Sequence, residues 1–317
     1  MAYGITVPFD GVPLAEHRSW YEELAALGYT DVWSGEASAL DAFTPLTLAA
    51  AWAPQLRVGT AIAPVYTRGA ATLAVTAAAL AEAAPGRFAL GVGSSSDVIV
   101  ENWNAVPFVS PWKRVRDTVR FLRAALSGER VDTAYDTFSV SGFRLARPPQ
   151  SVPPILVAAL RPGMLRLAGS EGDGAILNWL SSADVPRVAP LVGAGKEIVA
   201  RIFVAPTTDA DAVRALGRRF VAAYLNVGVY AAFQEWLGRG DVLRPMWDAW
   251  SAGDRKGAVD AIPDALVDEF IGWGEPKACR DFVARYVDNG VTTPVVALLL
   301  PPGVDQAQAV RNLAPGA

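Results

Sequence analysis

Short, almost continuously apolar runs alternate with longer amphipathic segments along the whole chain. We interpret the short runs as strands, because they lack the strict polar alternation of a half-exposed sheet and turn-forming or polar residues flank them. The predicted strands are Gly4–Val7, Asp31–Trp33, Arg57–Ile62, Phe88–Val92, Ile155–Ala158, Gly174–Leu177, Ile198–Val204 and Val295–Leu299. Such strands are typical of a parallel sheet that helices cover on its outer side.

The segments between these strands carry the period of amphipathic helices. Over Leu14–Leu27, Trp20 and Leu24 fall on one helical face, and Pro13 can occupy the helix start. Further helices are predicted over Leu46–Ala53, Ala70–Ala83, Trp112–Leu126, Met164–Gly169, Asp209–Tyr224 and Lys277–Asn289. Eight repeats of strand and helix close a barrel more naturally than they extend an open sheet. We therefore expect an α/β fold in which residues 1–317 form one domain, a (β/α)8 barrel of the TIM type.

Two segments interrupt this rhythm. The segment Arg130–Pro149 has short β-like runs on either side of Ser141-Gly142, which predicts a hairpin near residues 130–149. The segment Asn226–Phe270 holds several large aromatic residues among polar ones, which predicts additional helices over the barrel mouth near residues 226–270. We expect its tryptophans to pack this insertion; they are Trp236, Trp247 and Trp250.

The charge balance and the lack of long apolar runs limit the classes of partner that we expect. The chain has 28 basic and 32 acidic residues, a net charge of −4 and no block of like charge, so nucleic acid is not an expected partner. The N-terminal residues lack the pattern of a secretion signal, and no run approaches the roughly 18 uncharged apolar residues of a membrane-spanning helix. We expect a soluble, cytoplasmic protein.

The single histidine and single cysteine exclude more chemistry than any other feature of the composition. His17 and Cys279 are the only residues of their types, so disulfides within the chain and cysteine-based metal sites are excluded. Zinc catalysis usually needs two or three histidines, and His17 lies in the first helix, well before any strand end. Both residues are expected to be ordinary helix residues, and a metal-dependent or Ser-His-Asp hydrolase is not expected.

In a (β/α)8 barrel the functional residues lie at the C-terminal ends of the strands. Here those ends are Ser34–Ala37, Ala61–Pro64, Gly93–Asp97, Ala159–Gly163 and Asn178–Trp179. Small residues dominate these segments. They favour a flat ligand that is pressed against the backbone.

Three segments carry a family resemblance. They are Leu56–Arg68 at the third strand, Gly86–Ser96 at the fourth, and Pro153–Ile176 across the fifth and sixth. In this order they resemble the luciferase-like flavin and deazaflavin oxidoreductases. The run Val98–Asn104, followed by Pro107-Phe108, is similar to the deazaflavin-using actinobacterial branch of that family.

The resemblance implies a cofactor site at the barrel mouth. It implies a cis peptide bond between Ala61 and Ile62 that backs the central ring of the cofactor, with an ordinary strand end as the alternative. It also implies a phosphate site in which a serine run meets the backbone at a helix start. The alternatives there are a solvated serine loop and a surface charge at Arg161. The residues implied to bind the cofactor are Ala37, Ala61, Ile62, Ser94, Ser95, Ser96, Ala158, Ala159, Leu160, Arg161 and Gly163.

Two departures from the family pattern concern catalysis. Some relatives carry a catalytic histidine where this chain has Glu36-Ala37, and sugar-phosphate-oxidising relatives carry a catalytic acid where it has Ser96. Alcohol oxidation is therefore not expected. Glu36 is the candidate catalytic acid or base, or a hydrogen-bond partner of the cofactor, with a structural role as the alternative.

Three residues are candidates for the substrate pocket, namely Trp103, Asn178 and Trp179. The two tryptophans follow strand ends, where they could wall a pocket, and plain core packing is the alternative for both.

The resemblance implies hydride transfer between reduced F420, a deazaflavin, and a small organic substrate, with reduction of a C=C or C=N bond as the expected direction. The cofactor then supplies the chemistry that the missing histidines cannot. One alternative is an FMN-dependent monooxygenase that uses reduced flavin and oxygen, with a separate reductase as partner. Another is a flavin-binding protein without turnover. The resemblance also implies a homodimer.

Overall fold

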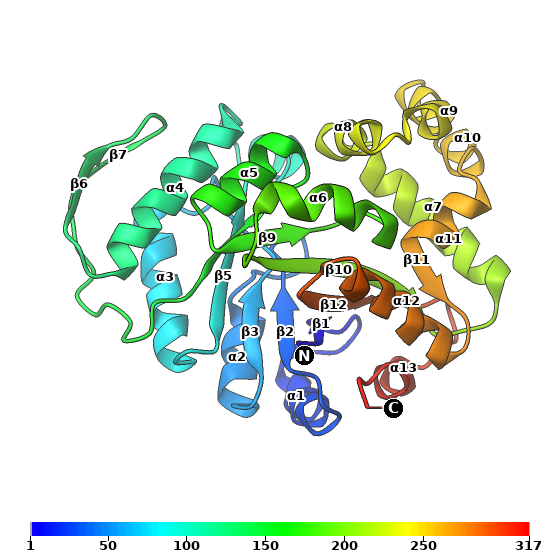
Figure 1. Ribbon diagram of the computed structural model, residues 1–317, viewed down its shortest axis with the longest axis horizontal. Coiled ribbons are helices and arrows are strands. Elements are labelled where there is room, and N and C mark those ends of the chain that lie inside the picture. The colour runs from blue at the N-terminus through cyan, green and yellow to red at the C-terminus, as the bar shows by residue number, and fades with distance from the viewer. Residues whose placement is uncertain (1, 317) are drawn as a thin grey trace.

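The structure is a computed structural model that describes residues 2–316. Within these residues, eight parallel strands form the wall of a barrel (Figure 1). The strands are β1 (Gly4–Thr6), β2 (Asp31–Ser34), β3 (Arg57–Thr60), β5 (Phe88–Gly93), β8 (Ile155–Ala158), β9 (Gly174–Leu177), β10 (Glu197–Ala205) and β12 (Thr293–Leu298). The last gap closes because β10 pairs with β9 as well as with β12. All eight predicted strands and the barrel are thus confirmed.

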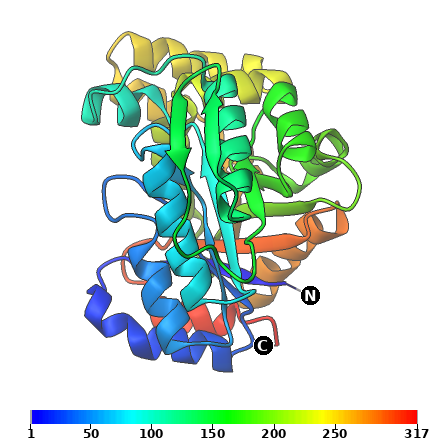
Figure 2. The ribbon, with the colours of Figure 1, turned by 90° about the vertical axis from the view of Figure 1, so that its left-hand side faces the viewer.

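Helices cover the outer face of the barrel, as both views show (Figures 1 and 2). They are α1 (His17–Ala26), α2 (Thr44–Trp52), α3 (Ala70–Ala83), α4 (Pro111–Leu126), α5 (Pro162–Ser170), α6 (Val185–Val192), α7 (Ala210–Leu225), α12 (Pro276–Asp288) and α13 (Gln306–Asn312). The first predicted helix begins as a 3-10 turn over Leu14–Glu16. Helices α6 and α13 were not predicted; Pro190 lies inside α6, and proline argues against a helix interior.

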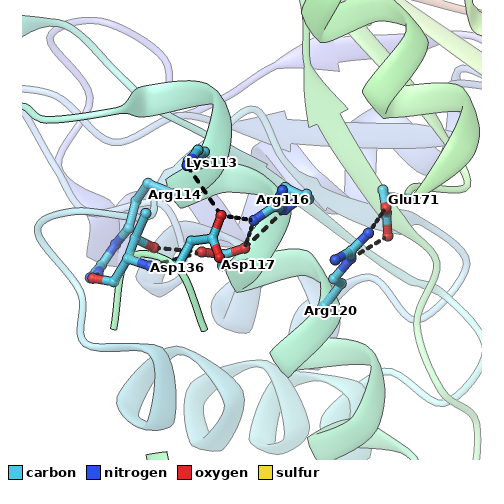
Figure 3. Close-up of polar contacts among 8 residues, drawn as sticks. Lys113, Arg114, Arg116, Asp117, Arg120, Asp136 and Glu171 are labelled. Carbon is cyan, nitrogen blue, oxygen red and sulfur yellow. Dashed lines mark hydrogen bonds and ion pairs between the residues drawn. The ribbon is translucent and has the colours of Figure 1, made fainter. Parts of the chain in front are cut away.

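The predicted hairpin consists of β6 (Val131–Ala134) and β7 (Ser139–Phe143), which pair antiparallel. Figure 3 shows how α4 holds it. The buried carboxylate of Asp117 accepts hydrogen bonds from the backbone N–H and the hydroxyl of Thr137, at 3.0 and 2.9 Å. Arg116 bridges Asp117 and Asp136, at 2.7 and 3.0 Å. These contacts tie the tip of the hairpin to the helix that begins beside the barrel mouth.

The predicted helical insertion forms α8 (Gly228–Leu237), α9 (Gly240–Ser251), α10 (Arg255–Asp260) and α11 (Asp264–Phe270). In Figure 1, α8, α9 and α10 lie above the barrel, at the end opposite α1 and α13. The side chains of Trp236, Trp247 and Trp250 are partly buried against the hydrophobic core. The insertion ends in a strand that was not predicted, β11 (Ile271–Trp273), which pairs parallel with β10.

The barrel interior is packed around one large side chain. Trp33 of β2 is 1% exposed, and its ring fills the space that two glycines leave open. A Cβ atom on Gly59 would lie 2.4 Å from this ring, and one on Gly4 would lie 3.0 Å from it. Packed around the same centre are Ala89, Leu156, Ile176, Val199 and Val295. The lower part of the barrel is therefore solid, and any ligand space lies above it.

An ion cluster closes the N-terminal end of the barrel. Arg57 pairs with Glu197 through two hydrogen bonds of 2.6 and 2.8 Å and with Asp31 at 3.2 Å. The hydroxyl of Thr293 donates a further bond to Glu197 at 2.8 Å. In this architecture that end contributes stability, whereas the opposite end carries function.

Candidate active site

The third strand ends in a bulge at the barrel mouth. The peptide bond between Ala61 and Ile62 is cis, as the resemblance implied, and the two following residues form the short strand β4 (Ala63–Pro64) that pairs with β5. The strand predicted to continue to Ile62 therefore stops at Thr60. The loop after β2 holds the bulge in place, because the N–H of Glu36 donates to the Ile62 carbonyl at 3.1 Å.

Beside the bulge lies a floor of small residues. A Cβ atom on Gly93 would lie 2.8 Å from the Cβ of Ala158 and 3.3 Å from the Cδ1 of Ile62, so these three residues from different strands meet at one point. Ala61, Ile62 and Ala158 are each half-buried, which leaves part of each side chain open at the mouth. Ala159 does not belong to this floor. It is 1% exposed and its side chain packs into the core, so any contact of Ala159 with a cofactor would involve its backbone.

The predicted phosphate site combines two segments that follow neighbouring strands. Ser94, Ser95 and Ser96 come after β5, and the start of α5 comes after β8, which pairs with β5. Ser96 accepts a hydrogen bond from the N–H of Ile99 at 3.4 Å, whereas the hydroxyl of Ser94 makes one bond, to the carbonyl of Ser95 at 3.3 Å. The structure thus brings the serines and the helix start to the same edge of the barrel.

The start of α5 is open to the mouth side. Leu160 is half-buried, Arg161 and Gly163 are exposed, and Pro162 occupies the first helical position. The indole Nε1 of Trp112 donates to the Gly163 carbonyl at 3.1 Å, which joins α4 to this turn. A helix start with free N–H groups attracts anions, so these residues suit a phosphate.

Glu36 does not project freely into the mouth. Its carboxylate accepts hydrogen bonds from Nε and Nη2 of Arg68, at 3.0 and 2.7 Å. The backbone N–H of Ala42 donates a third hydrogen bond to it, at 3.3 Å. Both side chains of the pair are about four-fifths buried, with exposures of 17% and 22%. The contacts with Arg68 and Ala42 fix the position of the Glu36 side chain, and the acid or base role stays a prediction.

Glu36 and Arg68 also line a groove of about 410 Å³. Ala37, Thr67 and Trp103 contribute to its walls, and Trp103 is 55% exposed. The structure therefore brings Trp103 to the same side of the barrel as Glu36 and Ala37, where it can contact a bound molecule.

The other two predicted pocket residues differ from each other. Trp179 is 1% exposed and packs against Phe203, with ring centroids 4.6 Å apart, so it belongs to the core between barrel and insertion. This burial favours core packing, the stated alternative to a pocket role for Trp179. Asn178 is half-buried, and its amide nitrogen donates to the hydroxyl of Tyr230 at 3.3 Å.

Sequence reasoning missed two residues at this point, Tyr230 of α8 and Arg201 of β10. Burial raises the pKa of the Tyr230 hydroxyl, while its hydrogen bond with Asn178 and the charge of Arg201 act in the opposite direction. Arg201 was hidden inside a run that was predicted as apolar strand. Its alternation with Val199 was the available signal, because residues two apart on a strand point to the same face.

The lone histidine is a packing residue, as predicted. His17 is fully buried; its Nε2 accepts the N–H of Phe9 at 2.9 Å, and its Nδ1 lies 3.0 Å from the Pro13 carbonyl. Both ring nitrogens therefore interact with the backbone of the segment between β1 and α1.

Cys279 is buried in α12, and burial raises the pKa of its thiol to about 11 from an ordinary value of 9.0. At a fixed mildly alkaline pH this corresponds to about a hundredfold less thiolate. We therefore expect a disulfide reagent such as 5,5′-dithiobis(2-nitrobenzoate) to label the folded protein at least about a hundredfold more slowly than the denatured protein. Fast stoichiometric labelling of the folded protein would contradict this placement.

Among residues 2–316, no three histidine, cysteine or carboxylate side chains come together as a metal site. Likewise, none of the helices in this range has the length and apolar character needed to cross a membrane.

Comparisons with known proteins agree with this geometry. A family described as luciferase-like monooxygenase matches residues 1–293. A 5,10-methylenetetrahydromethanopterin reductase from Methanolobus tindarius is 26% identical over 321 residues, which cover 97% of each chain. The coenzyme F420-dependent tetrahydromethanopterin reductase from Methanopyrus kandleri has a similar structure, with a TM-score of 0.79 at 19% identity over 99% of this chain and 97% of that one.

A flavin enzyme shares the fold as well. The oxygenating constituent of 3,6-diketocamphane monooxygenase from Pseudomonas putida, solved in complex with FMN, superposes with a TM-score of 0.67 at 15% identity, over 99% of this chain and 97% of that one. At these identities the two structural likenesses show a common barrel architecture.

Proposed function

Because the chain belongs to the luciferase-like monooxygenase family, and so to a family of flavin- and deazaflavin-dependent enzymes, we propose that it is an F420-dependent oxidoreductase. It exchanges a hydride with a small organic substrate, and the proposed direction is reduction of a C=C or C=N bond. The observation that carries the proposal is the floor of small residues beside the cis bulge at Ala61–Ile62. Support for the deazaflavin comes from the F420-dependent reductase with the same fold.

The residues present fit a flat ring system with a phosphate-bearing tail. A Cβ atom on Gly93 would fill the cradle between Ile62 and Ala158, so the absence of a side chain there keeps the floor open. The serine run and the start of α5 lie at the adjacent strand ends, where their hydroxyl and N–H groups would hold a phosphate. When bound, F420 supplies a ring carbon that donates or accepts a hydride.

The chain's own residues orient and enclose the reactants. The bulge at Ile62 presents an apolar surface that supports one face of a ring, and the loop from β2 fixes it through the N–H of Glu36. Arg68 occupies the carboxylate of Glu36 through its Nε and Nη2 atoms, so we assign the proton that a reduced substrate requires to solvent. Ser96 caps the following turn and offers no acid for alcohol oxidation.

The second candidate is an FMN-dependent monooxygenase, which the FMN complex with the same fold favours. The two functions differ in their response to oxygen, because reduced FMN reacts with it and reduced F420 does not. Oxygen consumption that depends on reduced FMN would therefore support the monooxygenase. Tight cofactor binding without turnover of any acceptor would instead support a binding protein.

The test is a fluorescence titration of the purified protein with F420 and with FMN. We expect F420 to bind at least about tenfold more tightly, a difference of about 1.4 kcal/mol. Equal or reversed affinities would reject the deazaflavin assignment.

A matched pair of glycine variants tests the location of the site. Gly93→Val places a side chain on the floor and is expected to weaken F420 binding by at least about tenfold. Gly240→Val is the control, since the nearest atom to a Cβ there is 3.6 Å away, in ordinary contact. Unchanged F420 affinity in a folded Gly93→Val protein would place the cofactor elsewhere.

A further inference from the structure

Arg201 is a partly buried cation without a partner. Its Nε atom is buried and has no hydrogen-bond acceptor, and no carboxylate among residues 2–316 pairs with its guanidinium. Two other arginines inside the fold are ion-paired: Arg57 pairs with Asp31 and Glu197, and Arg239 pairs with Asp184 and Glu269. A buried donor without an acceptor is unfavourable, and the Nε atom of Arg201 is such a donor, so the site would be completed by an acceptor from another molecule.

The strand places Arg201 at the barrel mouth. Val199 belongs to the interior cluster, and Arg201, two residues further along β10, points to the same face. The register pairs Ala200 with Leu177, so Arg201 lies level with Asn178, the residue after β9. Glu197 lies four residues back, about 13 Å along a strand, and is occupied by Arg57. No carboxylate on the interior face of β10 is therefore free to neutralise Arg201.

The closed strand order sets Arg201 opposite the cis bulge. Counting around the barrel, β12, β1 and β2 separate β10 from β3 on one side, and β5, β8 and β9 separate them on the other. Arg201 and the bond between Ala61 and Ile62 therefore come from strands that face each other across the mouth. A molecule supported on the bulge presents its free side toward β10.

The neighbours of Arg201 form a polar recess. The guanidinium lies over the ring of Phe203, 4.9 Å from its centroid. Asn178 donates to the Tyr230 hydroxyl, and its own side-chain oxygen is buried without a partner. One fixed cation, a phenol and an amide thus gather where α8 covers the mouth.

We propose that Arg201, with Tyr230 and Asn178, binds a planar anionic group, a carboxylate or a charged ring edge, at the barrel mouth. The planar guanidinium offers two parallel N–H donors to such a group, and Tyr230 and Asn178 add further hydrogen bonds. The anion has two sources, a carboxylate of the substrate or the charged edge of the bound cofactor ring. The second source rests on the proposed function, whereas the first does not require F420.

The experiment measures anion binding without cofactor. Benzoate and the uncharged benzamide are titrated by calorimetry into the cofactor-free protein, and F420 is titrated separately. Three variants are compared with the wild type. Arg201→Met removes the charge, Arg201→Lys keeps it without the planar fork, and Arg219→Met removes an exposed charge on α7 as the control.

If the anion belongs to the substrate, the wild type should bind benzoate at least about tenfold more tightly than benzamide. Arg201→Met abolishes this preference, Arg201→Lys restores part of it, and Arg219→Met leaves it intact. If the anion belongs to the cofactor, Arg201→Met should instead weaken F420 binding by at least about tenfold, and the wild type should show no preference for benzoate. Either result supports the anion site. The proposal is overturned if Arg201→Met changes neither benzoate nor F420 binding.

The unfolding temperature of Arg201→Met distinguishes a binding role of Arg201 from a structural role, because the two roles predict changes in opposite directions. Arg201 has no carboxylate partner to lose, and methionine can replace its contact with the Phe203 ring, so Arg201→Met should unfold at the same temperature as the wild type or a higher one. If the arginine instead holds the fold together, Arg201→Met will unfold several degrees lower, and the proposal fails. If wild-type F420 and FMN affinities are equal while the benzoate preference is present, the cofactor assignment alone is wrong.

Discussion

Replacing Arg57 with methionine is expected to lower the free energy of unfolding by about 3–5 kcal/mol at neutral pH. Arg57 is the only cation that pairs with Asp31 and Glu197 among the residues the structure describes, and it does so at 3.2 and 2.6 Å. The side chains are 26%, 3% and 21% exposed, so water does little to screen the charges that remain. Removing one partner of a buried ion pair leaves the other partner uncompensated, and here two carboxylates remain.

The loss should depend on pH in a defined direction. Burial acts to raise the pKa of Glu197, but the hydrogen bonds and charge of Arg57 outweigh it and hold that pKa below its ordinary value of 4.5. In the wild type Glu197 therefore adds stability above about pH 4.5, and this contribution is lost as pH falls through the lowered pKa. Burial raises the pKa of Asp31 even with Arg57 present.

In Arg57→Met the sign for Glu197 reverses. Without the guanidinium, burial raises its pKa, and both carboxylates then cost stability as they ionise with rising pH. The wild type and the variant should differ little near pH 3 and most near pH 7, as denaturant unfolding at both values can measure. Arg18→Met is the control, because the Arg18–Glu22 pair is exposed on α1 and contributes less than about 1 kcal/mol. An equal loss at both pH values would contradict the ion cluster as the cause.

Trp33→Ala should lower the free energy of unfolding by about 3–5 kcal/mol, because it empties the centre of the barrel. The ring packs against interior residues of several strands and is almost completely buried. The surrounding strands are held by their ladders, so they cannot collapse into the space. Trp103→Ala is the control on a surface tryptophan and should change stability by no more than about 0.5 kcal/mol.

A double variant makes this prediction specific to the geometry. Gly59→Ala alone should destabilise by about 1–3 kcal/mol, since its Cβ would lie 2.4 Å from the Trp33 ring. In the Trp33→Ala background the ring is gone and the added methyl fills part of the cavity. The loss of stability in the double variant should therefore be smaller than the sum of the losses in the two single variants, by at least about 1 kcal/mol. Strict additivity would show that the two residues are not in contact.

The order and number of barrel strands could be predicted from the chain because each strand is a continuous apolar run between turn residues. The elements that were missed have a local pattern that conflicts with their structure. Helix α6 contains Pro186 and Pro190, and it forms because its apolar side chains pack against the barrel. Strand β11 has three residues and exists only because β10 continues to Ala205, beyond the residues that pair with β9.

The candidate site was predicted unevenly for a similar reason. Positions after strands, such as Ile62 and Ser94, follow directly from the order of elements, and the cis bond at Ala61–Ile62 was implied by resemblance. Partners far apart in the sequence were not predictable. Arg68 forms an ion pair with Glu36, which lies 32 residues earlier in the sequence. Trp179 is buried in the core around Phe203.

By itself the sequence determined the barrel and its two insertions, and it predicted the edge at which we propose that ligands bind. Apolar periodicity and the order of strands can be read along the chain without knowing which residues are in contact. Only the tertiary structure decided which polar side chains are neutralised and which remain open. A charge on a strand has the same local pattern whether it meets a partner or not. Glu36, Arg57 and Arg201 became distinguishable only when the closed barrel set their distances and burial, on which electrostatic energies depend.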